Sequence, residues 1–138
     1  DSRIVYIKRS SEVGEYPGMF DIPGGHIDAP KSGIPDIFAS IEQEIFEELG
    51  VSVQNPINLL GLIETRETLK PELVFKVSSQ YTAKDIHSLA GSAKDRFEYT
   101  DLLFCPRSRL NGLLHDKTFS PSAYSSLVLY SQTQEVIC

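Results

Sequence analysis

The stretch DIPGGHID at residues 21–28, together with EQEIFEELGV at residues 42–51, decides the fold of this 138-residue chain. The first stretch places a pair of glycines in a turn, and the second lies in a segment with helical periodicity. Between about Ile34 and Leu49, at roughly 100° per residue, one face collects the apolar side chains of Ile37, Phe38, Ile41, Ile45 and Leu49. This stripe predicts an amphipathic helix that packs against the core, and Gly50 is typical of the residue that ends such a helix.

One margin of the predicted buried face is lined by the carboxylates of Glu44, Glu47 and Glu48. Glu44 and Glu48 are one helical turn apart, and Glu48 falls inside the edge of the apolar stripe. Like charges at this spacing repel, and a carboxylate withdrawn from water resists ionising, so a cation beside them relieves both costs. Mg²⁺ prefers oxygen ligands and usually takes one or two carboxylates together with substrate phosphate oxygens. The pattern therefore favours a Mg²⁺ site over the alternative, a solvated glutamate-rich face.

Residues 43–51 resemble the second half of the Nudix hydrolase signature and match it at every position but the first. The resemblance implies an α/β (α+β) fold, a Nudix-type α/β/α sandwich with a mixed sheet and a loop–helix–loop metal site. It also implies that Mg²⁺, with Mn²⁺ as a substitute, assists the attack of water on a nucleoside diphosphate linked to another group. By the same resemblance, Glu44 and Glu48 are principal metal ligands, Glu47 is an auxiliary ligand and the Gly24 carbonyl is a backbone ligand.

The first half of the signature departs from the family pattern. Counting back from Gln43, the signature glutamate falls on Pro35 and the signature glycine on Ala29, so Gly25 lies four residues too early and the loop 29–35 is expanded. Gln43 replaces the family's arginine, and a glutamine can donate a hydrogen bond but supplies no charge. These departures support an alternative hypothesis, in which the chain is a catalytically weak nucleotide-binding or regulatory Nudix module.

The departures also resemble one subgroup, the UDP-glucose pyrophosphatase-like Nudix proteins of eukaryotes. The resemblance is carried by residues 14–26, the long loop, Gln43 and residues 66–68, and more weakly by residues 97–104 and 121–123. It implies a diphosphatase that cleaves UDP-glucose or UDP-galactose to UMP and sugar 1-phosphate with Mg²⁺. A Nudix diphosphatase for ADP-ribose or coenzyme A is the remaining alternative.

Four further polar residues are candidates for the site. His26 follows the glycine pair and is expected to touch phosphate or sugar, or else to make a turn hydrogen bond. Arg9 and Arg66 lie at strand ends, where each could neutralise a phosphate or form a surface ion pair. Glu98 precedes an apolar strand and is a candidate for a further metal ligand or, with Glu47, for the catalytic base; nothing in the spacing brings it to the helix.

Composition bounds the class of protein. The chain has 41% hydrophobic and 23% charged residues, enough for one domain, and a net charge of −6 with a pI near 5.0 argues against nucleic-acid binding. No stretch approaches the roughly 18 apolar residues of a membrane span. The two cysteines, Cys105 and Cys138, favour a reduced, cytoplasmic setting. We therefore expect a small-molecule substrate, no nucleic-acid or membrane partner and no zinc site at His87 or His115; the oligomeric state is not set by sequence.

The resemblance implies one Nudix hydrolase domain over residues 1–138. It begins without methionine and runs directly into a strand at 3–9, so we expect an N-terminal portion of the domain to be absent. Further strands are predicted around 51–53, 57–64, 72–78 and 102–104. Helices are predicted from a cap at Thr82 to Leu89, with Gly91 as the stop, and from Pro121 to about Tyr130.

Overall fold

The computed structural model describes residues 2–133. Its strands are β1 (Arg3–Arg9), β2 (Phe20–Asp21), β3 (Asn58–Glu64), β4 (Pro71–Lys76) and β5 (Tyr99–Pro106). Its helices are α1 (Ile37–Leu49), α2 (Ala83–Ala90), α3 (Leu110–Asp116) and α4 (Pro121–Thr133), with 3₁₀ turns at η1 (Arg96–Glu98) and η2 (Arg107–Arg109).

The strands form two antiparallel sheets. In the first sheet β1 lies in the middle and pairs with β2 on one side and β5 on the other, and the second sheet is the hairpin of β3 and β4. The expected mixed sheet is therefore wrong for the described residues, whose parallel contact is an isolated bridge between Phe20 and Phe119. Because a short turn joins β3 to β4, these strands meet as an antiparallel hairpin without the long crossover that a parallel pair needs.

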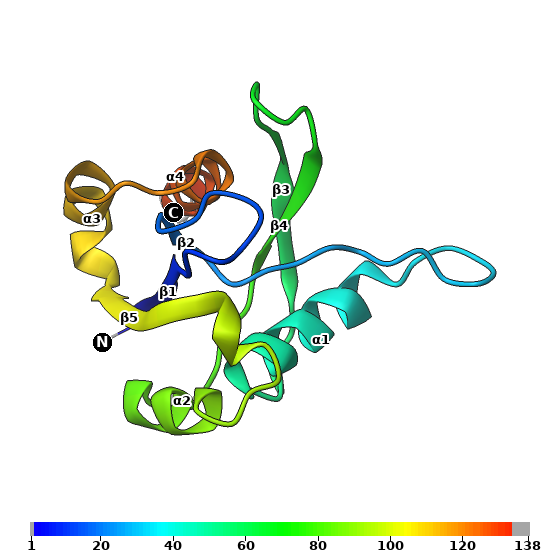
Figure 1. Ribbon diagram of the computed structural model, residues 1–138, viewed down its shortest axis with the longest axis horizontal. Helices are drawn as coiled ribbons and strands as arrows, with labels where there is room; N and C mark the ends of the chain where they lie inside the picture. The colour runs from blue at the N-terminus through cyan, green and yellow to red at the C-terminus, as the bar shows by residue number, and fades with distance from the viewer. Residues whose placement is uncertain (1, 134–138) are drawn as a thin grey trace.

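Helices cover both faces of the three-stranded sheet (Figure 1). Neighbouring residues of β1 point to opposite faces, so Ile7 and Tyr6 enter two different cores. The core on the Ile7 side includes Leu49 of α1 and Ile86 of α2, together with Val51, Ala90, Tyr99 and Leu102. The core on the Tyr6 side takes residues from α3 and α4, namely Leu110, Ala123 and Leu127, with Cys105 and Phe119. This layering confirms the predicted α/β/α class.

Helix α1 carries the predicted glutamates but begins later than the periodicity indicates. Its N-cap is Asp36, whose Oδ1 accepts hydrogen bonds from the backbone N–H groups of Phe38 and Ala39, both at 3.1 Å. Ile34 precedes a proline, a position that disfavours helical backbone, and it is exposed. The predicted end is confirmed, because Gly50 adopts the left-handed conformation with φ 68°.

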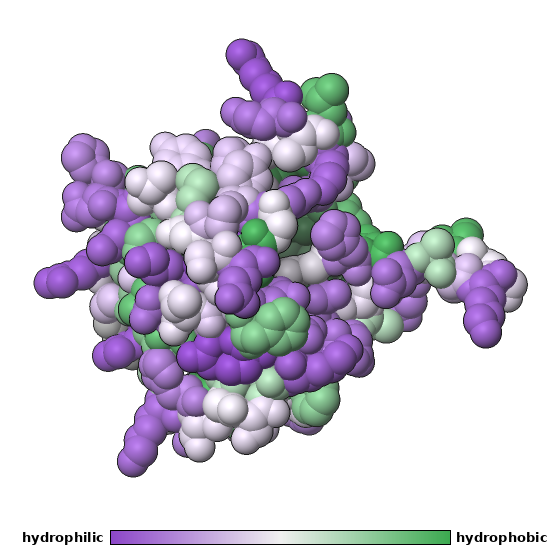
Figure 2. Space-filling view, viewed as in Figure 1, coloured by the Kyte–Doolittle hydropathy of each residue, from purple (hydrophilic) through white to green (hydrophobic). Residues whose placement is uncertain are grey.

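Other boundaries follow the sequence to different degrees. The capping box at Thr82 and Asp85 is present, and α4 begins at Pro121. The strand expected around 51–53 is wrong: residues 51–57 form none, and Val51 is apolar because it is buried in the core beside α1 and α2. Within residues 2–133, no helix combines the length and the apolar character that crossing a bilayer requires. The expanded loop 29–35 projects from the body of the molecule (Figures 1 and 2).

Candidate functional site

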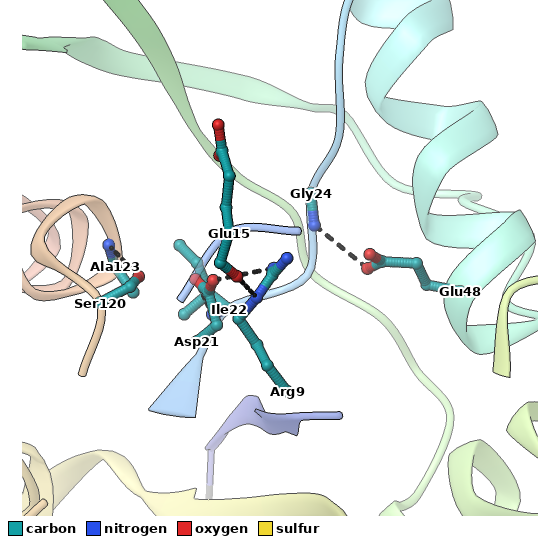
Figure 3. A network of polar contacts seen from close by, with 8 residues as sticks. All are labelled: Arg9, Glu15, Asp21, Ile22, Gly24, Glu48, Ser120 and Ala123. Atoms are coloured by element: carbon teal, nitrogen blue, oxygen red, sulfur yellow. Dashed lines mark hydrogen bonds and ion pairs between the residues drawn. The ribbon is translucent and has the colours of Figure 1, made fainter. Parts of the chain in front are cut away.

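The glycine pair lies directly against the carboxylates of α1. The backbone N–H of Gly24 donates a hydrogen bond to Oε2 of Glu48 at 3.1 Å (Figure 3). Gly25 lies so close to Glu44 that a Cβ at this position would be 2.1 Å from Glu44 Oε2. Any side chain at residue 25 would therefore displace the Glu44 carboxylate, so the glycine allows the loop to approach this glutamate closely.

Glu48 is a buried carboxylate, with 3% of its surface exposed. Its pKa is raised to about 8, first by burial and then by the negative charge of Glu98, against the opposing effect of the Gly24 hydrogen bond. The pKa of Glu44 is also raised, first by burial and then by the charges of Glu47 and Glu98. The charges of Glu44, Glu48 and Glu98 thus act on one another, and burial confirms that Glu48 lies at the edge of the apolar stripe.

Glu98 reaches this cluster because the chain before β5 is fastened to the last turn of α1. The backbone N–H of Asp95 donates to the Glu47 carbonyl, and the Tyr99 hydroxyl donates to the Glu48 carbonyl, both at 2.8 Å. These carbonyls belong to the helix end, where no backbone donor of the helix remains to pair with them. The docking brings Glu98, which lies between Asp95 and Tyr99, within range for its charge to raise the pKa values of Glu44 and Glu48, as the sequence spacing alone did not indicate.

Glu47 has different partners from the other two glutamates of α1. Its Oε1 accepts hydrogen bonds from Gln43 Nε2 at 2.7 Å and from Lys94 Nζ at 2.9 Å. These bonds, the one from Gln43 first, hold the pKa of Glu47 below its usual value. Glu47 therefore carries a paired charge, whereas Glu48 has a neutral N–H as its hydrogen-bond partner.

An open hollow of about 430 Å³ lies between α1 and the segment that precedes it. Glu44, Glu47 and Gln43 line it from the helix, and His26 and Lys94 line it from the neighbouring loops. His26 and Glu44 both line the hollow, and the charge effect of His26 lowers the pKa of Glu44. The hollow thus brings His26, a predicted substrate contact, together with two of the predicted metal ligands.

The fit of a divalent cation follows from the chemistry of these donors. Within residues 2–133, no three side chains of the metal-binding types are already arranged around one point, since Glu47 turns to Lys94 and Glu48 to Gly24. The donors nevertheless suit Mg²⁺, because they are carboxylate oxygens with mutually raised pKa values. A cation beside Glu44 and Glu48 would offset the burial and repulsion that raise them.

Comparison with known proteins finds relatives among the Nudix hydrolases. No family model matches the chain. It is 30% identical to Nudix hydrolase 9 of Arabidopsis thaliana over 74% of the chain and 40% of that protein. It is 26% identical to the uridine diphosphate glucose pyrophosphatase NUDT22 of Homo sapiens over 97% of the chain and 52% of that protein, and 29% identical to the Mus musculus protein over 96% and 50%. The chain is a homologue of the Nudix hydrolases.

The fold agrees with this relationship. A MutT protein from Methanosarcina mazei Go1 superposes with a TM-score of 0.63 at 14% identity, covering 95% of this chain and 84% of that one. The chain spans about half the length of the curated relatives that it matches. The Nudix-like segment 43–51 forms the last two turns of α1 and its glycine stop. Pro35, at the position of the signature glutamate, lies just before the N-cap of α1.

The structure separates the two arginines of the predicted Nudix site from the hollow. Arg9 donates from Nη1 to Asp21 Oδ2 at 3.1 Å and from Nε to the Glu15 carbonyl at 2.8 Å, so it holds the loop before β2 (Figure 3). Arg66 lies exposed in the turn of the β3–β4 hairpin, and this turn is at the end of the hairpin away from α1 (Figure 1). A phosphate contact by either arginine stays a prediction.

Two further polar residues, Lys94 and Asp21, lie near the predicted site residues. Lys94 and Asp21 are the polar residues of this region that sequence reasoning missed, since a loop lysine and a strand-end aspartate carry no distinctive spacing. Burial raises the pKa of Asp21, against the opposing effects of the Ile22 N–H and of Arg9.

The two other histidines have structural partners. His87 packs against Phe104, with 5.2 Å between ring centroids, and His115 pairs with Asp116. Cys105 is buried, and Cys138 lies outside the described residues.

Proposed function

We propose that the chain is a Mg²⁺-dependent Nudix diphosphatase that hydrolyses UDP-sugars, giving UMP and sugar 1-phosphate from UDP-glucose or UDP-galactose. The observation that carries the proposal is the placement of the glycine pair against Glu44 and Glu48, with the charge of Glu98 beside both. The homology to Nudix hydrolases supports the reaction class, and the mammalian relatives named as uridine diphosphate glucose pyrophosphatases support the substrate.

The proposed metal ligands are the groups that the loop and helix bring together. Glu44 and Glu48 would be the principal ligands, the Gly24 carbonyl a backbone ligand and Glu47 an auxiliary one, with Mn²⁺ able to replace Mg²⁺. When bound, the cation would neutralise charge on the phosphate oxygens and lower the pKa of a water molecule. The buried, repelling carboxylates are the feature of the chain that favours such a cation.

The side chains themselves would position water and accept its proton. In the proposed reaction a water oxygen forms a bond to one phosphorus, the bridging P–O bond breaks, and the proton passes to Glu98 or Glu47. Glu98 suits this role because it neighbours Glu44 and Glu48 without being on their helix. His26, at the rim of the hollow, would donate a hydrogen bond to a phosphate oxygen of the substrate.

A second candidate function is a nucleotide-binding module with weak or absent catalysis. It is favoured by Pro35 at the position of the signature glutamate and by Gln43 at the position of the signature arginine. A diphosphatase for ADP-ribose or coenzyme A is a third, because carboxylates and a cation serve any diphosphate. Discrimination among these substrates depends on pocket groups that pair with the base and sugar.

The test is turnover on a matched panel. We would incubate the protein with UDP-glucose, UDP-galactose, ADP-ribose or coenzyme A in Mg²⁺ and separate the products by chromatography. UMP and hexose 1-phosphate are expected, with a loss on the order of a hundredfold in Glu48→Gln, as for removal of one preorganised electrostatic group. Glu42→Gln, on the exposed face of α1, is the control.

The outcomes separate the candidates. A preference of tenfold or more for ADP-ribose or coenzyme A would refute the substrate assignment and keep the reaction class. Binding of UDP-glucose without turnover in Mg²⁺ or Mn²⁺ would support the non-catalytic module. Unchanged turnover and unchanged metal titration in Glu48→Gln would remove Glu48 from the metal site.

A further inference from the structure

Lys94, in the loop between α2 and η1, reaches across to the side chain of Glu47 on α1. We propose that Lys94 is a positioning residue that holds the Glu47 carboxylate in place and supplies the positive charge that Gln43 lacks. The inference rests on the proposed function, in which Glu47 is an auxiliary metal ligand or the proton acceptor. It adds a residue that the helix signature does not contain, 47 positions away from Glu47 in the chain.

Two side chains donate hydrogen bonds to the same oxygen of Glu47 and together hold its carboxylate. Gln43, one turn earlier on α1, donates from Nε2 to Glu47 Oε1 at 2.7 Å, and Lys94 donates from Nζ to the same oxygen at 2.9 Å. The amide supplies direction without charge, and the ammonium supplies charge on a flexible stem. Together the two side chains fix the carboxylate at the wall of the hollow, which all three line.

The backbone fixes where Lys94 starts. The next residue, Asp95, donates its N–H to the carbonyl of Glu47 itself at 2.8 Å. The segment is fastened again by the Tyr99 hydroxyl, which donates to the Glu48 carbonyl at 2.8 Å. Because these bonds hold the loop to the last turn of α1, the Lys94 ammonium has a short and defined reach to Glu47. The same segment carries Glu98, whose charge acts on Glu44 and Glu48, so one docked stretch supplies both Lys94 and Glu98 to the surroundings of these glutamates.

The competing explanation is a surface ion pair that serves no site. The Lys94 side chain is 70% exposed, and pairs of this kind contribute only about 0–1 kcal/mol to stability. Glu47, however, is 19% exposed at its side chain and lines the hollow. The two explanations differ in what they expect of Lys94→Ala. A surface pair leaves metal binding and turnover unchanged, whereas loss of a positioning residue lowers at least one of them while stability stays nearly constant.

The experiment uses four variants of the whole chain: Lys94→Ala, Lys94→Arg, Lys94→Ala combined with Gln43→Arg, and Lys84→Ala as the control. Lys84 is an exposed lysine on α2, outside the hollow. Three quantities are measured: Mn²⁺ affinity by calorimetry, kcat and KM for UDP-glucose in Mg²⁺, and the melting temperature in EDTA. The calorimetry reads the effect without depending on turnover.

Lys94→Ala is expected to lower Mn²⁺ affinity or kcat by about tenfold or more, as is typical when the partner of a metal ligand is removed. Its KM and its melting temperature in EDTA should change little. Lys94→Arg should retain function, and Gln43→Arg should restore it to Lys94→Ala by supplying charge from the helix. Lys84→Ala should match the wild type.

Two results would overturn the inference alone while the wild type binds Mn²⁺ and turns over substrate. The first is Lys94→Ala with wild-type affinity and kcat. The second is a loss that neither arginine variant restores, which would show that charge at this position is not what matters. Absence of both Mn²⁺ binding and turnover in the wild type would instead overturn the proposed function, and the inference with it.

Discussion

Replacing Glu48 by glutamine should stabilise the metal-free protein at neutral and mildly alkaline pH. The pKa of Glu48 rises from its ordinary 4.5 to about 8, mainly because the carboxyl is buried and also because Glu98 repels its charge. Between these two values the folded protein therefore holds a proton that the unfolded chain has released. Stability falls as pH rises through this window, because folding then keeps a buried acid protonated or, above pH 8, buries its charge.

The magnitude follows from the width of the window. At 1.36 kcal/mol for each pKa unit, a displacement from 4.5 to about 8 corresponds to about 5 kcal/mol when fully expressed, and to about 3 kcal/mol at pH 7. This is a large part of the roughly 5–15 kcal/mol that stabilises an ordinary domain. Glutamine retains a side-chain oxygen that can accept the Gly24 N–H, so Glu48→Gln removes the charge and keeps this contact.

The assay is urea unfolding in EDTA at pH 5, 7 and 8, with the wild type, Glu48→Gln and the exposed control Glu42→Gln. Wild type and control should lose about 3 kcal/mol between pH 5 and pH 8 from this group, and Glu48→Gln should lose much less. Equal pH dependence in wild type and Glu48→Gln would refute the reasoning, because it would mean that Glu48 titrates alike in the folded and unfolded chain.

Three further substitutions test the packing around the site. Gly25→Ala should displace the Glu44 side chain, because its Cβ would lie 2.1 Å from Oε2, and calorimetry should show weaker Mn²⁺ binding. The control is Gly112→Ala in α3, where an added Cβ would meet no atom within 4 Å and Mn²⁺ binding should not change. Gln43→Arg should fold with a melting temperature close to that of wild type and equal or higher activity, and a large loss of stability would show that the glutamine is required. Gly50→Ala should lower the free energy of unfolding by about 1–3 kcal/mol, because φ is 68° and a Cβ would meet the Leu89 carbonyl oxygen at 2.7 Å; wild-type urea stability would contradict this.

The helix of the site could be predicted because its determinants are local. Periodicity placed Glu48 at the edge of the buried face, and Gly50 marked the end of α1, as the structure confirms. The predicted start of α1 was three residues too early, because apolar Ile34 continues the hydrophobic pattern. The proline after Ile34 disfavours helical backbone, and the helix begins only after its N-cap at Asp36. Capping and proline signals can therefore be recognised in the sequence, and at a helix boundary they predict the first residue better than hydrophobic periodicity does.

The partners of the glutamates could not be predicted from spacing. Lys94 and Glu98 meet α1 only because a loop docks on the carbonyls of its last turn, which is a tertiary event with no local signature. The same limit explains Arg9 and Arg66, which occupy similar strand-end positions in sequence. One is fixed to Asp21, and the other is exposed in a hairpin turn.

Tertiary contacts also give the neighbouring glutamates Glu47 and Glu48 of α1 different electrostatic surroundings. Glu47 receives a lysine, whereas Glu48, which is far more buried, receives a neutral N–H and the repulsion of Glu98. A buried carboxylate without a cation lowers the stability of the protein that carries it, unless it stays protonated. A ligand that brings positive charge to Glu48 must therefore bind the folded chain in preference to the unfolded one, and binding and stability become linked. A positive charge would be most favourable beside Glu48, because burial and the repulsion of Glu98 both raise its pKa, and this is why our proposal rests on the surroundings of Glu48 more than on the helix spacing.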